Sequence, residues 1–225
     1  MEETLLGFDV RERWATPDPL WGTNRRARYL LRPDIVKPLS ADTLVWSSVF
    51  DTGHGPGLSA TERDRLRLTG VATPAWIGPN AGLWDDLPRM LATFQHAIPE
   101  LWAAVRAHTV LAISWLSDAG FSTTGVVGPY AAPTTPATRD ERWPVLGYDV
   151  GDGSLLSGLM NCGYGDDERD ALRAWWGHRL NDAHLFHTAA DAFAFRALSN
   201  ARTPAHAPFF VYGLYAVADV AGSAR

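Results

Sequence analysis

Hydrophobic and polar residues alternate most regularly in two short segments that nearly repeat each other. Residues 5–10 read Leu-Leu-Gly-Phe-Asp-Val and residues 145–150 read Val-Leu-Gly-Tyr-Asp-Val. A period of two is typical of a strand with one apolar and one polar face, so each segment is predicted to be a short, half-buried strand. Two interpretations of the repeat stay open: a coincidental similarity between two strands, and a pseudo-symmetric arrangement of two related strand elements.

Irregular and regular segments follow one another after the first of these strands. Residues 11–40 are interrupted by four prolines, which predicts an irregular, packed segment. Residues 43–50 are rich in β-formers and lead into the glycine-rich run 51–57, which predicts a strand followed by a turn. Residues 59–62, Ser-Ala-Thr-Glu, match a capping box, so a short helix is predicted as far as Leu68.

The middle of the chain carries hydrophobic residues at helical spacing on both sides of Pro99. The first set lies within residues 84–98 and the second within residues 101–116. Pro99 suits the first turn of the second helix, and Gly120 suits its C-terminal cap. A helical pair, or one helix bent at Pro99, is therefore predicted. Residues 121–142 are rich in glycine, proline and threonine, and they are predicted to be a linker or a long surface loop.

The last third of the chain has the pattern of a βααβ unit. After the strand at 145–150, the acidic residues 166–168 begin one predicted helix, and a second helix is predicted over residues 188–201. Residues 208–217 are apolar on both faces, which is typical of a central strand covered by helices. In chain order, the prediction is a strand, two helices and a second strand.

Together these elements predict an α+β or α/β fold in which helices pack on a mixed sheet. The predicted organisation is an N-terminal strand and helix region over residues 1–120, the linker 121–142 and the C-terminal βααβ unit 143–225, within one compact domain. With 225 residues, 46% of them hydrophobic, the chain is long enough to form a substantial core.

Composition and charge narrow the classes of partner. The net charge of −5 and the isoelectric point near 5.8 argue against general binding to nucleic acids or anionic membranes. The single cysteine excludes an intramolecular disulfide, the acidic N-terminus does not resemble a signal peptide, and no apolar run is long enough to span a membrane. A cytoplasmic location is therefore expected. Lys37 is the only lysine among 20 basic residues, which indicates a GC-rich bacterial genome.

Cysteine and histidine residues in the last third are the first candidates for chemistry. Cys162 with His184 or His187 would give a thiol nucleophile and its base, although a buried cysteine that packs as a small hydrophobic residue fits the sequence as well. His184 and His187 are spaced as two metal ligands on one helical turn, but no second pair supplies further ligands, and histidines also cap helix ends. No metal ion or cofactor is predicted.

Two sets of residues that contain aspartate suggest weaker alternatives. In the loop 51–57, His54 beside Asp51 would form a base with its orienting carboxylate, and a tight exposed turn explains the same glycines. Asp9 and Asp149 occupy the same position in the two repeated segments, where paired carboxylates would divide the roles of acid and nucleophile. Aspartate beside a turn on a solvated face is the other interpretation of this pair.

Aromatic residues and one arginine cluster are the candidates for recognition. Trp175 and Trp176 are adjacent, and neighbouring positions on a helix diverge by about 100°, so at most one of the two can point straight into the core. Tyr212 lies in the apolar final segment, where exposure at an interface and burial under a second layer are both open. Arg25 and Arg28 belong to a basic cluster that would bind an acidic partner or a phosphate, or lie solvated in ion pairs.

The function predicted from these features is that of a non-catalytic cytoplasmic bacterial protein that binds another protein. An immunity protein or an effector chaperone that occludes its partner would fit, with Trp175, Trp176, Tyr212, Arg25 and Arg28 as binding residues. The alternative is a hydrolase or transferase of unfamiliar type that uses Cys162 or a histidine in a cleft. A lesser alternative is a carbohydrate or small-ligand binder with stacked tryptophan rings.

Overall fold

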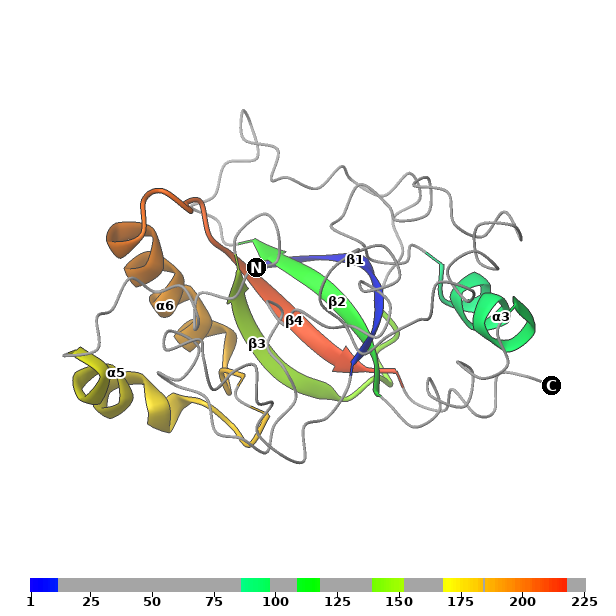
Figure 1. Ribbon diagram of the computed structural model, residues 1–225, viewed down its shortest axis with the longest axis horizontal. Helices are drawn as coiled ribbons and strands as arrows, with labels where there is room; N and C mark the ends of the chain where they lie inside the picture. The colour runs from blue at the N-terminus through cyan, green and yellow to red at the C-terminus, as the bar shows by residue number, and fades with distance from the viewer. Residues whose placement is uncertain (12–85, 98–108, 118–138, 152–167, 184, 218–225) are drawn as a thin grey trace.

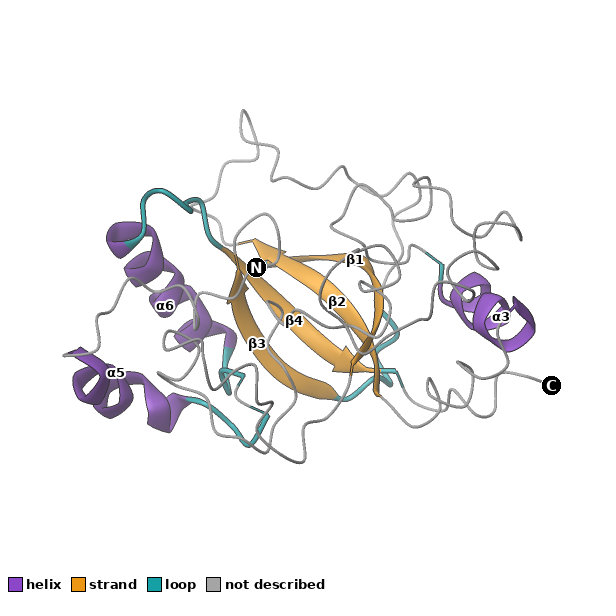
Figure 2. Ribbon diagram, in the orientation of Figure 1, coloured by secondary structure: helices purple, strands orange, loops and turns teal. Residues whose placement is uncertain are grey.

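The computed structural model describes residues 1–11, 86–97, 109–117, 139–151, 168–183 and 185–217. These residues form four strands, three α-helices and a 3-10 turn, which makes the described part an α+β structure (Figures 1 and 2). In chain order the elements are β1 (Glu2–Arg11), α3 (Leu87–Ala97), β2 (Thr109–Ser117), β3 (Val145–Gly151), α5 (Arg169–Trp176), η3 (Gly177–Arg179), α6 (Ala189–Arg202) and β4 (Phe210–Ala216).

The four strands form one sheet in the order β1-β2-β4-β3, and each neighbouring pair is antiparallel. The prediction of a mixed sheet is therefore wrong for the described strands. The connection from β3 to β4 gives the reason. If one helix joined two adjacent strands, the second strand would run parallel to the first. Here two antiparallel helices, α5 and α6, lie between β3 and β4, so β4 begins beside the end of β3 and runs in the opposite direction. The predicted central position of residues 208–217 is confirmed, because β4 lies inside the sheet and is buried along almost its whole length.

The predicted helix over residues 101–116 is wrong where the structure describes it. Residues 109–117 form the central strand β2 instead. A strand that is buried on both faces carries hydrophobic residues at almost every position, so its spacing also satisfies a helical pattern. The β-branched residues Thr109, Val110 and Ile113 favour the strand. The helix predicted over 84–98 is confirmed as α3, and the one predicted over 188–201 is confirmed as α6.

Several other predicted elements lie outside the described residues. They are the irregular segment 11–40, the strand 43–50, the turn 51–57, the helix ending at Leu68 and most of the linker 121–142.

The two repeated hexapeptides occupy equivalent positions at opposite edges of the sheet. Leu6 and Leu146 are the extra residues at a register shift, and each is followed by a glycine with a positive φ: 155° at Gly7 and 146° at Gly147. A glycine adopts this backbone conformation without the steric penalty that a side chain would bring. The shared Leu-Gly step therefore places a β-bulge at the same point of both edge strands.

The strand registers give the sheet an approximate two-fold arrangement. Gly7 pairs with Ile113, Ile113 with Leu214, and Leu214 with Gly147, so one row crosses the whole sheet with a bulge at each end. An axis between Ile113 and Leu214 relates β1 and β2 to β3 and β4. The repeat in the sequence thus corresponds to equivalent places in the sheet.

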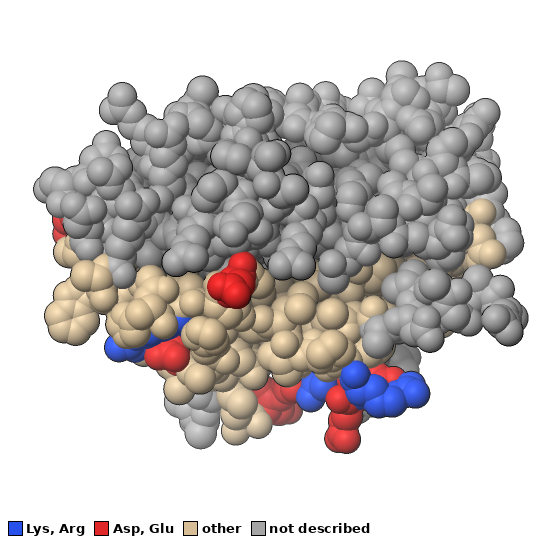
Figure 3. All heavy atoms as spheres, turned by 90° about the horizontal axis from the view of Figure 1, so that it is seen from below, with Lys and Arg blue, Asp and Glu red and all other residues tan. Residues whose placement is uncertain are grey.

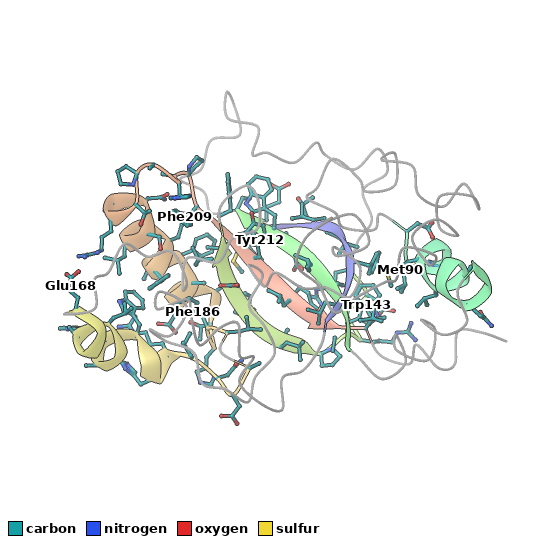
Figure 4. The ribbon with its side chains drawn as sticks, viewed as in Figure 1. Met90, Trp143, Glu168, Phe186, Phe209 and Tyr212 are labelled. Carbon is teal, nitrogen blue, oxygen red and sulfur yellow. The ribbon has the colours of Figure 1, made fainter. Side chains whose placement is uncertain are left out.

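One face of the sheet, which we call the helical face, packs against α5 and α6. Its core includes Leu116, Val150 and Val211 from the strands and Leu172 and Phe195 from the helices. In Figure 4, Phe186 and Phe209 also lie between α6 and the sheet, and both are fully buried. The other face has its own core, which contains Leu6, Leu111, Ile113, Leu185, Phe210, Tyr212 and Leu214.

Two ion pairs hold α5 and α6 antiparallel. Glu168, next to the start of α5, accepts a hydrogen bond of 2.6 Å from Arg202 at the end of α6. Arg179, after the end of α5, donates one of 3.0 Å to Asp191 in the first turn of α6. Thr188 caps α6, because its hydroxyl accepts a hydrogen bond from the backbone N–H of Asp191. Each end of α5 is therefore fixed to the opposite end of α6.

Candidate functional site

The exposed side of α5 is the first candidate for a binding surface. Trp175 is 69% exposed, and of the described residues it is the large aromatic side chain with the greatest exposure. Its neighbour Trp176 points the other way, into the core of the helical face. The expected divergence of the two rings is confirmed, because adjacent positions on one helix face different directions. The helix thus holds one indole in solvent and one in the core.

Trp176 connects this helix to the core of the helical face. Its ring lies edge-on to Phe195 at 4.9 Å and to Phe186 at 6.2 Å between centroids. The guanidinium of Arg179 covers the same indole at 4.8 Å and also pairs with Asp191 of α6. Contacts of this kind fix the orientation of a helix as well as its position. The direction in which Trp175 points is therefore set by the core.

The surroundings of Trp175 leave its ring accessible. Ala171, Ala174, Trp175 and His178 are all exposed, and their spacing of three, one and three residues places them on one side of the α5–η3 segment. Two alanines beside a tryptophan make a low surface from which the indole protrudes. We call these four residues the α5 stripe.

A second cluster joins β1, β4 and the segment before β3. The Nε–H of Arg139 donates a hydrogen bond of 3.1 Å to Oε1 of Glu3, and the Arg139 guanidinium lies over the ring of Tyr215 at 4.4 Å from its centroid. The carboxylate of Glu3 is also close enough to the Tyr215 phenol to raise its pKa. Glu3, Arg139 and Tyr215, which we call the Glu3 cluster, therefore contact one another around one aromatic face.

Burial and the neighbouring carboxylate affect the acidity of Tyr215. Burial raises the pKa of its phenol well above the usual range, and the nearby carboxylate of Glu3 raises that pKa further, because both disfavour a second negative charge. The ring lies close to Gly213 of the same strand, where an added Cβ would stand 2.6 Å from the Tyr215 hydroxyl. Ser114, directly opposite Gly213 on β2, is fully buried, and its hydroxyl has no hydrogen-bond partner among the described residues. Small residues at these two positions leave room for the ring.

A turn next to the Glu3 cluster contains a bidentate pair. Arg142 donates to Asp140 through Nε at 3.0 Å and through Nη2 at 2.6 Å, and its backbone N–H donates to the same carboxylate at 2.9 Å. The side-chain hydrogen bond from Arg142 is the main cause that lowers the pKa of Asp140 from 3.8 to about 2. Figure 3, which views the molecule from below, shows basic and acidic side chains next to each other among the described residues on that side.

The Arg142→Gln variant tests the origin of this low pKa. We expect the pKa of Asp140 to rise from about 2 toward 3.8 when the guanidinium is removed. A carboxyl group with a depressed pKa in the folded state stabilises the fold above its unfolded pKa and loses this contribution as the pH falls through the folded value. The contribution of Asp140 to the free energy of unfolding is therefore lost between about pH 4 and pH 2. A carboxyl carbon titration by NMR measures the pKa of this group, and an unchanged Asp140 pKa in the variant would contradict the assignment.

The structure separates Asp9 from Asp149. The two aspartates lie on opposite edge strands. Asp9 pairs with Leu111 of β2. Asp149 pairs with Tyr212 of β4, which pairs with Trp115 of β2, four residues beyond Leu111. Three strand spacings and four residues place their backbones roughly 14 Å apart across the sheet and about 13 Å apart along it. The interpretation of Asp9 and Asp149 as a catalytic pair is therefore wrong. Asp149 is also fully buried rather than solvated, and its Oδ1 accepts a hydrogen bond from the backbone N–H of Val150.

Of the other predicted site residues, Tyr212 and His187 are described by the structure and the rest are not. Tyr212 is fully buried because β4 is covered on both faces, so it is not part of an exposed binding surface. His187 is exposed in the loop just before α6 and is not on a helical turn, which removes the spacing argument for a metal pair. The remaining members lie outside the described residues: Arg25, Arg28, Cys162 and His184.

Sequence reasoning did not find the Glu3 cluster. Glu3 and Arg139 are 136 residues apart, and neither stands in a motif. Arg139 belongs to the predicted linker, where a charged residue is normally read as solvated. Only the tertiary fold brings these side chains together, so no local pattern would have revealed them.

The described residues contain no group of three or more His, Cys, Asp or Glu side chains placed to hold a metal ion. Among the helices that the structure describes, none has the length and apolar character needed to cross a membrane. Comparisons of the chain with protein families, with curated proteins and with solved structures gave no match.

Proposed function

We propose that this protein acts by binding another protein, and that the α5 stripe is the centre of the contact. The observation that carries the proposal is the exposure of Trp175 on a helix whose opposite side is fixed in the core by Trp176. An exposed indole costs solvation free energy in the free protein, and tryptophan is enriched at the centres of protein interfaces. A rigid anchor also loses little conformational freedom when it binds.

The proposal includes the finer predictions from the sequence. The protein is a non-catalytic protein of the bacterial cytoplasm, of the immunity or effector-chaperone kind, which occludes a basic region of its partner. The net charge of −5 supports the choice of a basic partner, because electrostatic complementarity speeds association and excludes acidic competitors. The alternative is a hydrolase or transferase that uses Cys162 or a histidine in a cleft. Cys162 and His184 lie outside the described residues, and His187 is exposed.

The Trp175→Ala variant tests the proposal. We expect the partner to be recovered with the wild-type chain from cells of its native host, and we expect the variant to bind the purified partner with a Kd roughly 30-fold higher. This corresponds to about 2 kcal/mol, the usual loss when an anchor residue is truncated. Binding is measured by calorimetry with both proteins purified. The unfolding midpoint is expected to change little, since the removed ring is mostly in solvent.

Val145→Ala is the matched control. Val145 is 50% exposed, apolar and on β3 rather than on α5, so its removal leaves the α5 stripe intact. Its Kd for the partner is expected to rise far less than that of the Trp175→Ala variant, because Val145 pairs with Tyr215 of β4 and lies away from the α5 stripe. Equal loss of binding in both variants, or no loss in the Trp175→Ala variant, would refute the α5 stripe as the contact surface.

A further inference from the structure

The Glu3 cluster has the composition of a recognition site for a guanidinium group. A guanidinium is planar and positively charged, and it binds best where an aromatic face stacks on its plane and a carboxylate accepts its N–H groups. Tyr215 supplies the aromatic face and Glu3 supplies the carboxylate. In the structure, the group bound there is the chain's own Arg139.

The contact between Arg139 and Glu3 is incomplete. Arg139 reaches Glu3 through Nε alone, and its Nη1 is directed at the backbone oxygen of Asp140 at 3.4 Å. Arg142, in the same segment, makes a more complete contact, because it donates to Asp140 through both Nε and Nη2. Bidentate pairing is stronger than a single hydrogen bond. Among the described residues, Arg139 therefore makes a single hydrogen bond to Glu3 rather than a bidentate pair.

The cluster is also accessible enough for exchange. The side chains of Arg139 and Glu3 are 24% and 30% exposed, and ion pairs with this much solvent contact contribute little to stability. Tyr215 is only 2% exposed, and the guanidinium of Arg139 covers its ring. A group that replaces Arg139 would find the aromatic face already in position.

We propose that Glu3 and Tyr215 form a binding site for an arginine side chain of a partner protein, and that Arg139 occupies this site until the partner displaces it. The site lies on β1 and β4, and it uses none of the residues of the α5 stripe. It extends the proposed function by a second contact with an identified chemistry, and either proposal can fail without the other.

The Arg139→Gln variant tests this site with N-acetyl-L-arginine amide, a compound whose only charge is its guanidinium. Glutamine keeps most of the side-chain length and removes the competing cation. We expect the variant to bind the compound at least about tenfold more tightly than the wild-type chain, because no internal group has to be displaced. We expect this variant to bind N-acetyl-L-lysine amide at least about fivefold more weakly than the arginine compound, because an ammonium group neither stacks on an aromatic ring nor forms bidentate hydrogen bonds with a carboxylate. Both affinities are measured by NMR titration.

Arg142→Gln is the matched control, since it removes a neighbouring arginine outside the cluster, and its affinity is expected to equal that of the wild type. Adding Glu3→Gln to Arg139→Gln is expected to abolish saturable binding. The proposal is wrong if Arg139→Gln binds the arginine compound no more tightly than Arg142→Gln, if the lysine compound binds equally well, or if the double variant still binds.

A measurement on the wild-type chain covers the case in which Arg139→Gln does not fold. Excess arginine compound is expected to shift the Nε–H resonance of Arg139 and to leave that of Arg142 unchanged. An unshifted Arg139 resonance at saturating compound would overturn the proposal.

Discussion

The Phe195→Ala variant is expected to lose about 4 kcal/mol of unfolding free energy, the largest loss among the substitutions considered. Phe195 is fully buried on α6, with its ring centroid 4.9 Å from that of Trp176 and 5.2 Å from that of Phe186. Truncation of a buried phenylalanine removes the hydrophobic burial and leaves a cavity, and it also ends two aromatic contacts. Chemical denaturation followed by tryptophan fluorescence measures the loss. It is a large share of the 5 to 15 kcal/mol typical of a folded domain.

Phe193→Ala is the matched control on the same helix. Phe193 is half-buried, and the guanidinium of Arg196 lies over its ring at 4.8 Å. Its truncation leaves no closed cavity, so a loss of about 1 kcal/mol is expected. Equal losses of unfolding free energy in the two variants would show that the core of the helical face does not depend on the contacts among Trp176, Phe186 and Phe195.

The Gly147→Ala variant is expected to lose about 3 kcal/mol. Two independent effects add here. The φ of 146° is strained for a residue with a side chain, and the new Cβ would stand 2.6 Å from Cβ of Leu185 and 2.8 Å from Nδ2 of Asn181. Asn181 donates to the backbone oxygen of Leu146 and accepts from the backbone N–H of Leu185. The added methyl group therefore displaces the segment that covers the edge of β3.

Gly177→Ala is the control for this prediction. An added Cβ at Gly177 meets no atom within 4 Å, so the unfolding free energy is expected to change by less than about 1 kcal/mol. Hydrogen exchange separates the local effect from the global one. The Gly147→Ala variant is expected to lose protection at the Phe186 N–H, which donates to the Tyr148 oxygen at 2.7 Å. Retained protection together with unchanged stability would contradict the steric argument.

Sequence patterns predicted some elements well and misjudged others for one physical reason. The helix predicted over residues 188–201 matches α6 within one residue at each end, and the cap at Thr188 that the structure shows is also a local signal. Residues 109–117 looked helical because a strand covered on both faces loses its polar alternation. Tyr212 was predicted as a binding residue from its type alone, and the position of β4 in the middle of the sheet is what buries it.

The sequence by itself determined that the chain carries two repeated strand segments, a helix over about residues 188–201, an apolar central strand and one of two adjacent tryptophans outside the core. These features follow from backbone preference and side-chain periodicity, which act over a few residues. Only the tertiary structure decided that the repeated segments lie at opposite edges, that Asp9 and Asp149 stay apart, and that Glu3 meets Arg139 and Tyr215. Strand pairing joins residues more than a hundred positions apart, and no local pattern encodes which partners it selects.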